Sequence, residues 1–197
     1  AVRELAASAD VILAIGTELG ETDYDVVFDD GFHLNGTLIR IDLDPEQLAR
    51  NQRTTLGLVG DAGRSLELLL EHFSAPLKRQ GAERTAAALN ALDLANDPAF
   101  RDFVPLYAAL ADHLPEAILV GDSTAPVYAG NHLVSQPAPR RYFNASTGYG
   151  TLGYGLPAAL GAQLARPDLP VVALVGDGGV MFTLSELATA VEARLPV

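Results

Sequence analysis

The last third of the chain, residues 144–197, constrains the fold most strongly. A glycine-rich turn at 147–155 is followed by an apolar strand at 170–175, and Gly176-Asp177-Gly178-Gly179 comes directly after that strand. A buried strand that runs through these glycines into a helix places one carboxylate and several backbone N–H groups at one point. Such a point suits a diphosphate that carries a divalent metal, because Mg²⁺ prefers carboxylate and phosphate oxygens.

Strand and helix patterns alternate along the chain. Continuous apolar runs of strand length are typical of parallel strands that are covered on both faces. The alternation predicts an α/β fold with two open, parallel, Rossmann-like sheets, both incomplete in this chain. The predicted strands are 11–15, 37–43, 55–59, 117–120, 141–144 and 170–175, and the predicted helices include 2–8, 62–73, 98–113 and 154–165.

The composition changes around residues 75–97, which are rich in alanine and charged residues and lack a strand pattern. We therefore predict three parts: residues 1–74 as the end of a first α/β domain, 75–97 as a linker with some helix, and 98–197 as the start of a second α/β domain. The first residues already lead into a strand, and Leu195-Pro196-Val197 is typical of the approach to one. We expect the chain to be a piece of a longer protein.

Two local signals give more detailed predictions about helix starts. Proline is tolerated in the first turn of a helix, so Pro98 predicts that the helix of residues 98–113 begins there. Thr183 and Glu186 have the spacing of a capping box, in which each side chain bonds a backbone N–H group near the other. The last helix is therefore expected to be capped by Thr183.

Composition excludes several classes of function. The formal net charge is −12 and no basic stripe is present, which argues against binding to nucleic acid. No apolar run approaches the roughly 20 residues of a membrane span. The chain has no cysteine, which rules out disulfides and thiolate-bound zinc and favours a reducing compartment such as the cytoplasm.

The spacing Gly148-x-Gly150-x-x-Gly153 matches the dinucleotide-binding fingerprint. That fingerprint needs a firm strand before it, whereas residues 141–144 form a poor one. Asp177 closes the following strand but is flanked by glycines, which suits a phosphate or a metal better than a ribose. An NAD-binding oxidoreductase remains an alternative. A purely structural role, in which the glycines allow a tight turn and close helix packing, is another.

A second polar turn, Asp122-Ser123-Thr124, follows the strand predicted at 117–120. Its hydroxyl and N–H groups could also hold a phosphate, while an ordinary helix N-cap by Asp122 or Ser123 explains the sequence equally well. Asp177, too, could be an ordinary hydrogen-bonded turn residue. The four histidines lack the spacing of metal ligands; they are His33, His72, His113 and His132.

Together these stretches resemble the thiamine-diphosphate enzymes of the acetohydroxyacid synthase and 2-oxo-acid decarboxylase family. Residues 147–164 resemble the glycine-rich segment of that family, and residues 170–197 resemble its Gly-Asp-Gly segment. Residues 11–61 resemble the second half of its central domain, with Arg40-Ile41-Asp42-Leu43-Asp44-Pro45 as the marker. The resemblance implies that the first predicted domain belongs to the central domain and the second to the diphosphate-binding domain.

The resemblance also implies roles for individual residues. Asp177 would be a magnesium ligand, and Gly178 and Gly179 would offer N–H groups to the diphosphate. The Gly150 carbonyl would accept a hydrogen bond from the amino group of the cofactor, and Leu152 would be the apolar wedge that bends the cofactor. Asp122, Ser123 and Thr124 would line the far side of the pocket. The full implied cofactor-binding set is Asp122, Ser123, Thr124, Gly150, Thr151, Leu152, Gly176, Asp177, Gly178 and Gly179.

The implied activity is decarboxylation of a 2-oxo acid, or carboligation of the acetolactate synthase type, with thiamine diphosphate and Mg²⁺ as cofactors. FAD is not expected, because residues 16–20 lack the arginine that the synthases use. The turn at 121–128 resembles decarboxylases that act on the arginine-derived 5-guanidino-2-oxopentanoate.

No catalytic residue is assigned within this chain. The resemblance places the activating glutamate and a second metal ligand outside residues 1–197, so the chain alone would be inactive. Active sites in this family are shared between subunits, which implies a homodimer or homotetramer of the full-length protein. A non-catalytic scaffold domain that keeps the fold is a further alternative.

Overall fold

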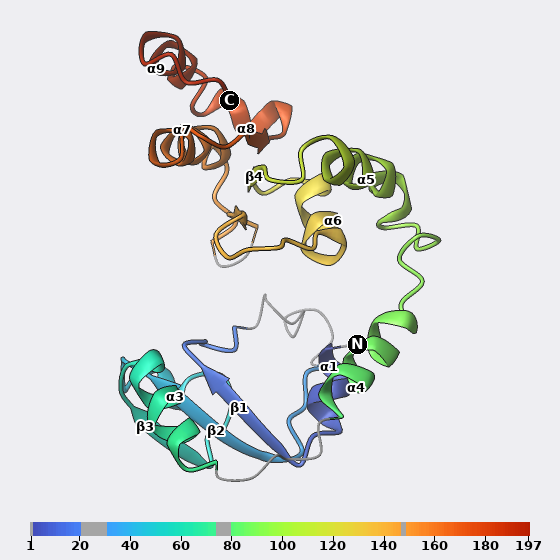
Figure 1. Cartoon of the computed structure of the whole chain (residues 1–197), viewed down its shortest axis with the longest axis vertical. Helices are drawn as coiled ribbons and strands as arrows, with labels where there is room; N and C mark the ends of the chain where they lie inside the picture. Colours follow the sequence, from blue (N-terminus) through green and yellow to red (C-terminus); the bar gives the residue numbers. More distant parts are fainter. Residues whose placement is uncertain (1, 21–30, 74–79, 147–148) are drawn as a thin grey trace. The chain divides into compact units, whose positions relative to one another are not determined.

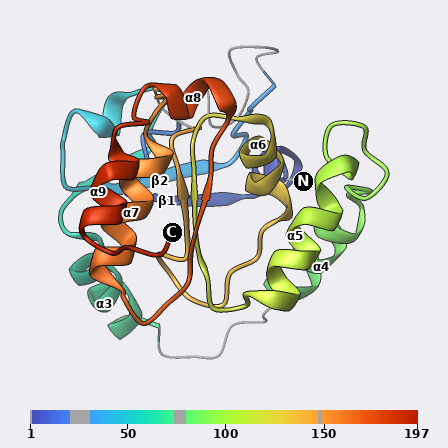
Figure 2. The same cartoon turned by 90° about the horizontal axis from the view of Figure 1, so that it is seen from above.

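The computed structural model of the chain describes residues 2–20, 31–73, 80–146 and 149–197 (Figure 1 and Figure 2). The chain forms two compact units, residues 1–92 and 93–197. Their boundary falls within residues 75–97, and the described part of that segment contains a helix, α4 (Gly81–Asn90). Among the described helices, none has the length and apolar character needed to cross a membrane.

The first unit is built on a parallel sheet in the order β1-β2-β3, in which Val11 pairs with Thr37 and Ile39 with Leu56. Each strand lies close to its predicted position. Asp61 caps the following helix by accepting a hydrogen bond from Arg64 N at 2.9 Å. The elements are α1 (Val2–Ala7), β1 (Val11–Ile15), β2 (Thr37–Asp42), the 3-10 helix η1 (Gln47–Ala49), β3 (Leu56–Val59), α3 (Ala62–Glu71) and α4.

The sheet of the first unit carries a small apolar core. Ala14, Leu38 and Phe32 are buried in it. Other apolar strand residues remain accessible, since Leu13 is 41% exposed and Leu56 is 49% exposed. The prediction of strands covered on both faces is therefore not met in the described part of this unit.

The second unit is built on a parallel sheet in the order β5-β4-β6. Figure 2 shows α7 and α9 on one side of these strands and α5 and α6 on the other. The elements are η2 (Arg101–Phe103), α5 (Val104–His113), β4 (Ile118–Gly121), α6 (Ala125–Leu133), β5 (Tyr142–Asn144), α7 (Gly155–Ala165), β6 (Val171–Leu174), α8 (Asp177–Met181) and α9 (Glu186–Glu192).

The central strand β4 is buried along its whole length. Ile118 and Val120 pack with Ala159 of α7, whereas Leu119 packs with Tyr107 of α5. This alternation follows from strand geometry, in which successive side chains point to opposite faces. A strand covered on both faces needs a continuous apolar run, and β4 confirms that prediction.

The strand order gives this sheet a switch point at β4. From β4 the chain passes through α6 to β5 on one side, and then through α7 to β6 on the other side. Leu119 accordingly pairs with both Tyr142 and Val172. Crossovers that run in opposite directions place their helices on opposite faces. In open α/β sheets, ligands bind beyond the carboxyl ends of the strands at such a point.

The helix predicted from Pro98 begins later than expected. Residues 98–100 form a turn, in which Ala99 N donates to Asp97 Oδ1 at 2.8 Å, and α5 begins at Val104. Pro105 explains the difference, because it lies in the first turn of α5, where its missing N–H is tolerated. In a helix that began at Pro98, Pro105 would lie in the interior and remove a hydrogen bond.

The capping box predicted for Thr183 and Glu186 does not form between these two described residues. Helix α9 begins at Glu186, and its N-cap is Ser185. Thr183 Oγ1 instead donates to the carbonyl of Gly153 at 3.1 Å, and Glu186 Oε2 accepts from Thr189 Oγ1 at 2.9 Å. The Glu186 N–H, which a capping box would direct to the Thr183 side chain, donates to the Thr183 backbone carbonyl at 2.9 Å.

Candidate functional site

Three loops meet at the carboxyl edge of the sheet β5-β4-β6. Residues 122–124 follow β4, residues 149–153 lie between β5 and α7, and residues 176–179 follow β6. All ten residues of the predicted cofactor-binding set lie in these loops. Thr147 and Gly148, which belong to the predicted glycine turn, lie outside the described residues.

Asp177 is exposed at the carboxyl end of β6. It is the first residue of α8, and its Oδ1 accepts a hydrogen bond from Gly178 N at 2.8 Å. Apart from chain neighbours and the helix's own backbone, no atom of the described residues lies within 4 Å of the position that a Cβ of Gly178 would occupy. The carboxyl group and the backbone beside it are therefore accessible to a cation or a phosphate from solvent.

The glycine turn lies against the loop that follows β6. Leu152 Cδ2 is 3.8 Å from the position that a Cβ of Gly179 would occupy, and Leu152 is 49% exposed. Thr151, the preceding residue, is exposed as well. Gly150 and Gly153 have φ angles of +59° and +83°, which favour glycine. The turn therefore presents an apolar side chain to solvent beside the loop that contains the exposed carboxyl group.

Asp122 has a different setting, because its side chain is fully buried. Its Oδ1 accepts a hydrogen bond from Ser123 N at 2.9 Å, and its Oδ2 accepts one from Gly153 N at 2.8 Å. Both oxygens are directed to backbone inside the fold. The structure therefore departs from the expectation that the side chain of Asp122 lines a ligand pocket.

Ser123 and Thr124 remain partly exposed after β4. Ser123 Oγ lies 2.8 Å from the Tyr128 hydroxyl and 3.5 Å from the position that a Cβ of Gly150 would occupy. Thr124 Oγ1 lies 3.1 Å from the corresponding position at Gly176. The N-cap of α6 is Thr124, and its side chain makes no capping hydrogen bond within this described helix. The N-cap that the sequence suggested for Asp122 or Ser123 does not form, because Thr124 occupies that position.

Sequence reasoning missed Gly153 and Thr183 as a link between two loops. The Gly153 N–H donates to Asp122, while its carbonyl accepts from Thr183 Oγ1 at 3.1 Å. The backbone of one glycine thus connects the loop after β4 with the segment after α8. The third glycine of the fingerprint was the available signal, since that position permits close packing between a turn and its neighbours.

A second hydrogen-bonded group holds α6 against the end of β5. The Tyr142 hydroxyl donates to the Val127 carbonyl at 3.0 Å, and Asn144 Nδ2 donates to Asn131 Oδ1 at 3.0 Å. Asn131 Nδ2 in turn donates to Ser146 Oγ at 2.8 Å. Burial raises the pKa of Tyr142, so its hydroxyl stays protonated and can donate. These contacts fix the chain shortly before the glycine turn.

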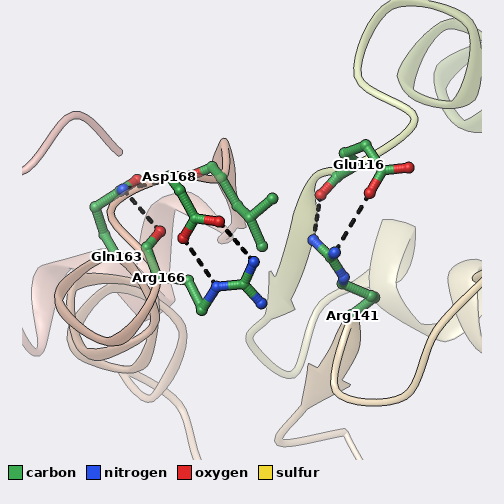
Figure 3. A network of polar contacts seen from close by, with 6 residues as sticks. Glu116, Arg141, Gln163, Arg166 and Asp168 are labelled. Carbon is green, nitrogen blue, oxygen red and sulfur yellow. Dashed lines mark hydrogen bonds and ion pairs between the residues drawn. The ribbon is translucent and has the colours of Figure 1, made fainter.

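At the amino edge of the same sheet, arginine and glutamine side chains donate to carboxyl and carbonyl oxygens (Figure 3). Arg166 Nε and Nη2 donate to the two carboxyl oxygens of Asp168 at 2.8 and 2.6 Å. This pairing lowers the pKa of Asp168 from 3.8 to about 2. Arg141 Nη1 donates to the carbonyl of Glu116 at 2.6 Å. The buried Gln163 donates through Nε2 to two backbone carbonyls at 3.3 Å.

The site offers a single exposed carboxyl group among its ten described residues, that of Asp177. Within the described ranges, no three His, Asp or Glu side chains gather into a group that could hold a metal ion. One carboxylate is compatible with Mg²⁺, which keeps several waters and takes further oxygens from phosphate groups. The open backbone at Gly178 leaves room for such a phosphate. The residues present therefore fit a metal-bound diphosphate better than a metal held by the protein alone.

Two protein-family models match the chain. The model described as "Thiamine pyrophosphate enzyme, central domain" matches residues 1–69. The model described as "Thiamine pyrophosphate enzyme, C-terminal TPP binding domain" matches residues 121–197. The second match includes all three loops at the carboxyl edge of the sheet.

Similar curated proteins align with nearly the whole chain. A probable 2-ketoarginine decarboxylase (AruI) of Pseudomonas aeruginosa is 38% identical over 194 residues, which are 96% of this chain and 34% of that protein. The acetolactate synthase large subunit of Parasynechococcus marenigrum is 31% identical over 198 residues, 95% of this chain and 31% of that protein. The chain thus spans about a third of the length of the curated relatives it matches.

A solved structure shares the fold. An X-ray structure of a candidate thiamin diphosphate-dependent enzyme from Mycobacterium smegmatis matches with a TM-score of 0.69 and 24% sequence identity. The match covers 99% of this chain and 38% of that one. Both open parallel sheets, predicted from the alternation of strands and helices, therefore occur together in a known architecture.

Proposed function

The chain belongs to the thiamine pyrophosphate enzyme family, and we propose that it forms part of an enzyme that uses thiamine diphosphate and Mg²⁺ to act on a 2-oxo acid. The observation that carries the proposal is the exposed carboxyl group of Asp177 at the carboxyl end of β6, next to the switch strand β4, with Leu152 beside Gly179. Residues 1–74 would then belong to the central domain and 98–197 to the diphosphate-binding domain, with 75–97 as the linker.

The loops after β6 and β4 would hold the diphosphate end of the cofactor. Asp177 would bind Mg²⁺, which would also take oxygens from the diphosphate. Gly178 and Gly179 lie in the first turn of α8, where backbone N–H groups have no carbonyl partner within the helix. The Gly178 N–H, which donates to Asp177 Oδ1, would turn to a diphosphate oxygen once that carboxyl group bound the metal. The partly exposed hydroxyls of Ser123 and Thr124 would contact the diphosphate from the other side.

The glycine turn would hold the other end of the cofactor. The carbonyl of Gly150 would accept a hydrogen bond from the amino group, and Leu152 would support the bent shape. Thr151 would complete the turn, and Gly176 would keep the loop after β6 close to Thr124. When bound, thiamine diphosphate supplies a ring that accepts the electrons released when a carbon–carbon bond next to a carbonyl breaks.

Two reactions fit this family, the decarboxylation of a 2-oxo acid and carboligation of the acetolactate synthase type. We favour decarboxylation, because the relative named as a 2-ketoarginine decarboxylase is 38% identical and the acetolactate synthase is 31% identical. The first substrate to test is therefore 5-guanidino-2-oxopentanoate, with pyruvate as the comparison. FAD is not expected, since residues 16–20 contain no arginine.

We further propose a homodimer or homotetramer in the cytoplasm for the full-length protein. The assembly follows from the active sites that enzymes of this family share between subunits. The compartment follows from the lack of cysteine in the chain.

Two alternatives predict different binding. An oxidoreductase would bind NAD through the fingerprint around Gly150, but both family models favour thiamine diphosphate instead. A scaffold domain would keep the fold and bind neither cofactor.

Calorimetric titration of the full-length protein with thiamine diphosphate and Mg²⁺ tests the proposal. We expect the wild type to bind, and Asp177→Ala to bind about a hundredfold more weakly, because the metal loses a carboxylate ligand beside the phosphates. Asp168→Ala is the matched control, since it removes an exposed aspartate at the opposite edge of the same sheet and should bind like the wild type. Equal affinity of wild type and Asp177→Ala would contradict the proposed metal site.

A further inference from the structure

The buried carboxyl group of Asp122 lies at the centre of the candidate site. One of its bonds stays within its own loop, to Ser123 N, and the other reaches Gly153 N, which is 31 residues away in the sequence. Both partners are backbone N–H groups. The carboxyl group therefore determines where two segments of backbone lie, while its own side chain has no access to solvent.

The same side chain also supports the loop that follows β6. A Cβ built on Gly179 would lie 2.6 Å from Asp122 Oδ2, which is closer than a side chain allows. A Cβ built on Gly155 would lie 3.2 Å from Asp122 Cβ. Gly155, after the glycine turn, and Gly179, in the loop after β6, thus pack around one aspartate residue, and Gly179 faces its carboxyl group.

One oxygen of this group connects the two halves of the site. Oδ2 of Asp122 binds Gly153 N, directly after Leu152, and contacts Gly179, two residues after Asp177. Direct contact with a ligand would need an exposed oxygen, and both oxygens are enclosed and bonded to backbone. Its effect on a ligand must therefore act through the backbone that it holds.

We propose that Asp122 is a positioning residue for the cofactor site. It holds the turn of residues 150–153 at a fixed distance from the loop of Asp177, and it does so without touching the cofactor. The inference rests on the proposed function. Asparagine cannot replace Asp122, because its amide keeps one acceptor oxygen and turns an NH₂ group toward the remaining N–H donor.

Gln163 provides a matched control at the opposite edge of the same sheet. It is almost fully buried, and its Nε2 donates to two backbone carbonyls. Gln163→Met removes both hydrogen bonds with little change in volume. Both Asp122→Asn and Gln163→Met should lower stability, and only Asp122→Asn should change the geometry of the cofactor site.

The experiment compares the two variants with the wild type as full-length proteins. The dissociation constant for thiamine diphosphate is measured by calorimetry with Mg²⁺, and deuterium exchange is measured without cofactor in the peptide that spans residues 149–156. We expect Asp122→Asn to raise the dissociation constant about tenfold, which corresponds to the loss of one buried hydrogen bond, and to speed exchange at Gly153. Gln163→Met should change neither quantity.

The outcomes separate this inference from the proposed function. Asp122→Asn that binds thiamine diphosphate as tightly as the wild type would overturn the role of Asp122. Equal weakening in Gln163→Met would also overturn it, because binding would then follow stability. A wild type that binds no thiamine diphosphate would count against the proposed function instead. If Asp122→Asn does not fold, Gly179→Ala displaces the same oxygen from the other side. Because Gly179 is itself proposed to contact the diphosphate, the deciding result for this variant is faster exchange at Gly153 without cofactor, and unchanged exchange would overturn the role of Asp122.

Discussion

The two edges of the sheet β5-β4-β6 share the same strands but are stabilised by different contacts. At the carboxyl edge, a side chain bonds the backbone of a glycine, as Asp122 does with Gly153. At the amino edge, arginine and glutamine side chains donate to carboxyl and carbonyl oxygens, as Arg166 does to Asp168 and Gln163 to two backbone carbonyls (Figure 3). The glycine loops leave backbone accessible, as at Gly178, whereas the donors of the amino edge bond the turns that lead into the strands. The carboxyl edge is therefore suited to bind a ligand and the amino edge to close the fold.

Strand order explains why the site lies in the second unit. Both described sheets are parallel and three-stranded, but β1-β2-β3 proceeds in one direction, whereas β5-β4-β6 reverses around β4. A crevice opens at the carboxyl ends where the connections diverge to opposite faces. Within the described residues, both units alternate strands and helices, but only the strand order of the second unit creates a switch point, and the candidate site lies there.

The largest predicted effect concerns Gly153, at the carboxyl edge. Gly153→Ala would force a side chain onto a residue with φ +83° and place its Cβ 2.8 Å from Phe182 Cβ. We expect a loss of about 3 kcal/mol in the free energy of unfolding and a loss of cofactor binding, because strain and overlap add. Thermal unfolding and calorimetric titration of the full-length protein measure the two effects.

Gly161 is the matched control for that substitution. It lies inside α7, and outside its own helix backbone and chain neighbours no described atom lies within 4 Å of its Cβ position. Gly161→Ala should stabilise the protein by about 0.5–1 kcal/mol, because alanine loses less backbone freedom on folding. If Gly153→Ala were as stable as Gly161→Ala, the carboxyl edge would tolerate side chains, and the distinction between the edges would disappear.

Local sequence patterns were sufficient to predict much of the fold. The six described strands all overlap the predicted ones. Burial on both faces explains the apolar run of β4, whereas β3 has such a run although its side chains are exposed. The glycines marked the loops for an equally local reason, as Gly150 and Gly153 have positive φ angles. Asp177 lies between a strand end and a helix start, as predicted, but Asp122 has the same kind of place after β4 and is buried, so the position alone does not decide exposure.

The contacts between the loops could not be predicted in the same way. Periodicity does not show on which side of β4 each later strand pairs, and it does not link Asp122 to a glycine 31 residues away. Two helix starts were wrong because other residues decided them. Pro105 places the start of α5 at Val104, and Thr183 lies before the N-cap of α9, with its hydroxyl donating to the Gly153 carbonyl. The first deviation follows from a second proline in the sequence, and only the second accompanies a tertiary contact that a local pattern does not show.

Arg141 tests whether the two edges act independently. Its side chain is 12% exposed, and its Nη1 donates to the Glu116 carbonyl at 2.6 Å, which ties the start of β5 to the start of β4. Arg141→Met should lower the free energy of unfolding by about 1 kcal/mol, because the carbonyl loses a charged donor. The affinity for thiamine diphosphate should stay unchanged. A loss of affinity comparable to that of Asp122→Asn would show that the sheet transmits changes between its edges.

The smallest effect is expected for the pair of Arg166 and Asp168, because both side chains are largely in solvent, where ion pairs contribute little. The hydrogen bonds from Arg166 lower the pKa of Asp168 from 3.8 to about 2. A carboxyl group with a lowered folded-state pKa stabilises the fold above its unfolded-state pKa, and that contribution is lost as the pH falls through the folded-state value.

The stability difference between wild type and Asp168→Asn should therefore be present at about pH 5 and disappear between about pH 4 and pH 2. Urea unfolding at a series of pH values measures this difference, and added salt should reduce it at the upper end of the range. A difference that stays constant down to about pH 2 could not come from the charge of Asp168. The contribution of this turn to stability would then come from the backbone conformation of residues 166–168 and not from the ion pair. The amino edge would in that case resemble the carboxyl edge, where backbone conformation at glycines matters most.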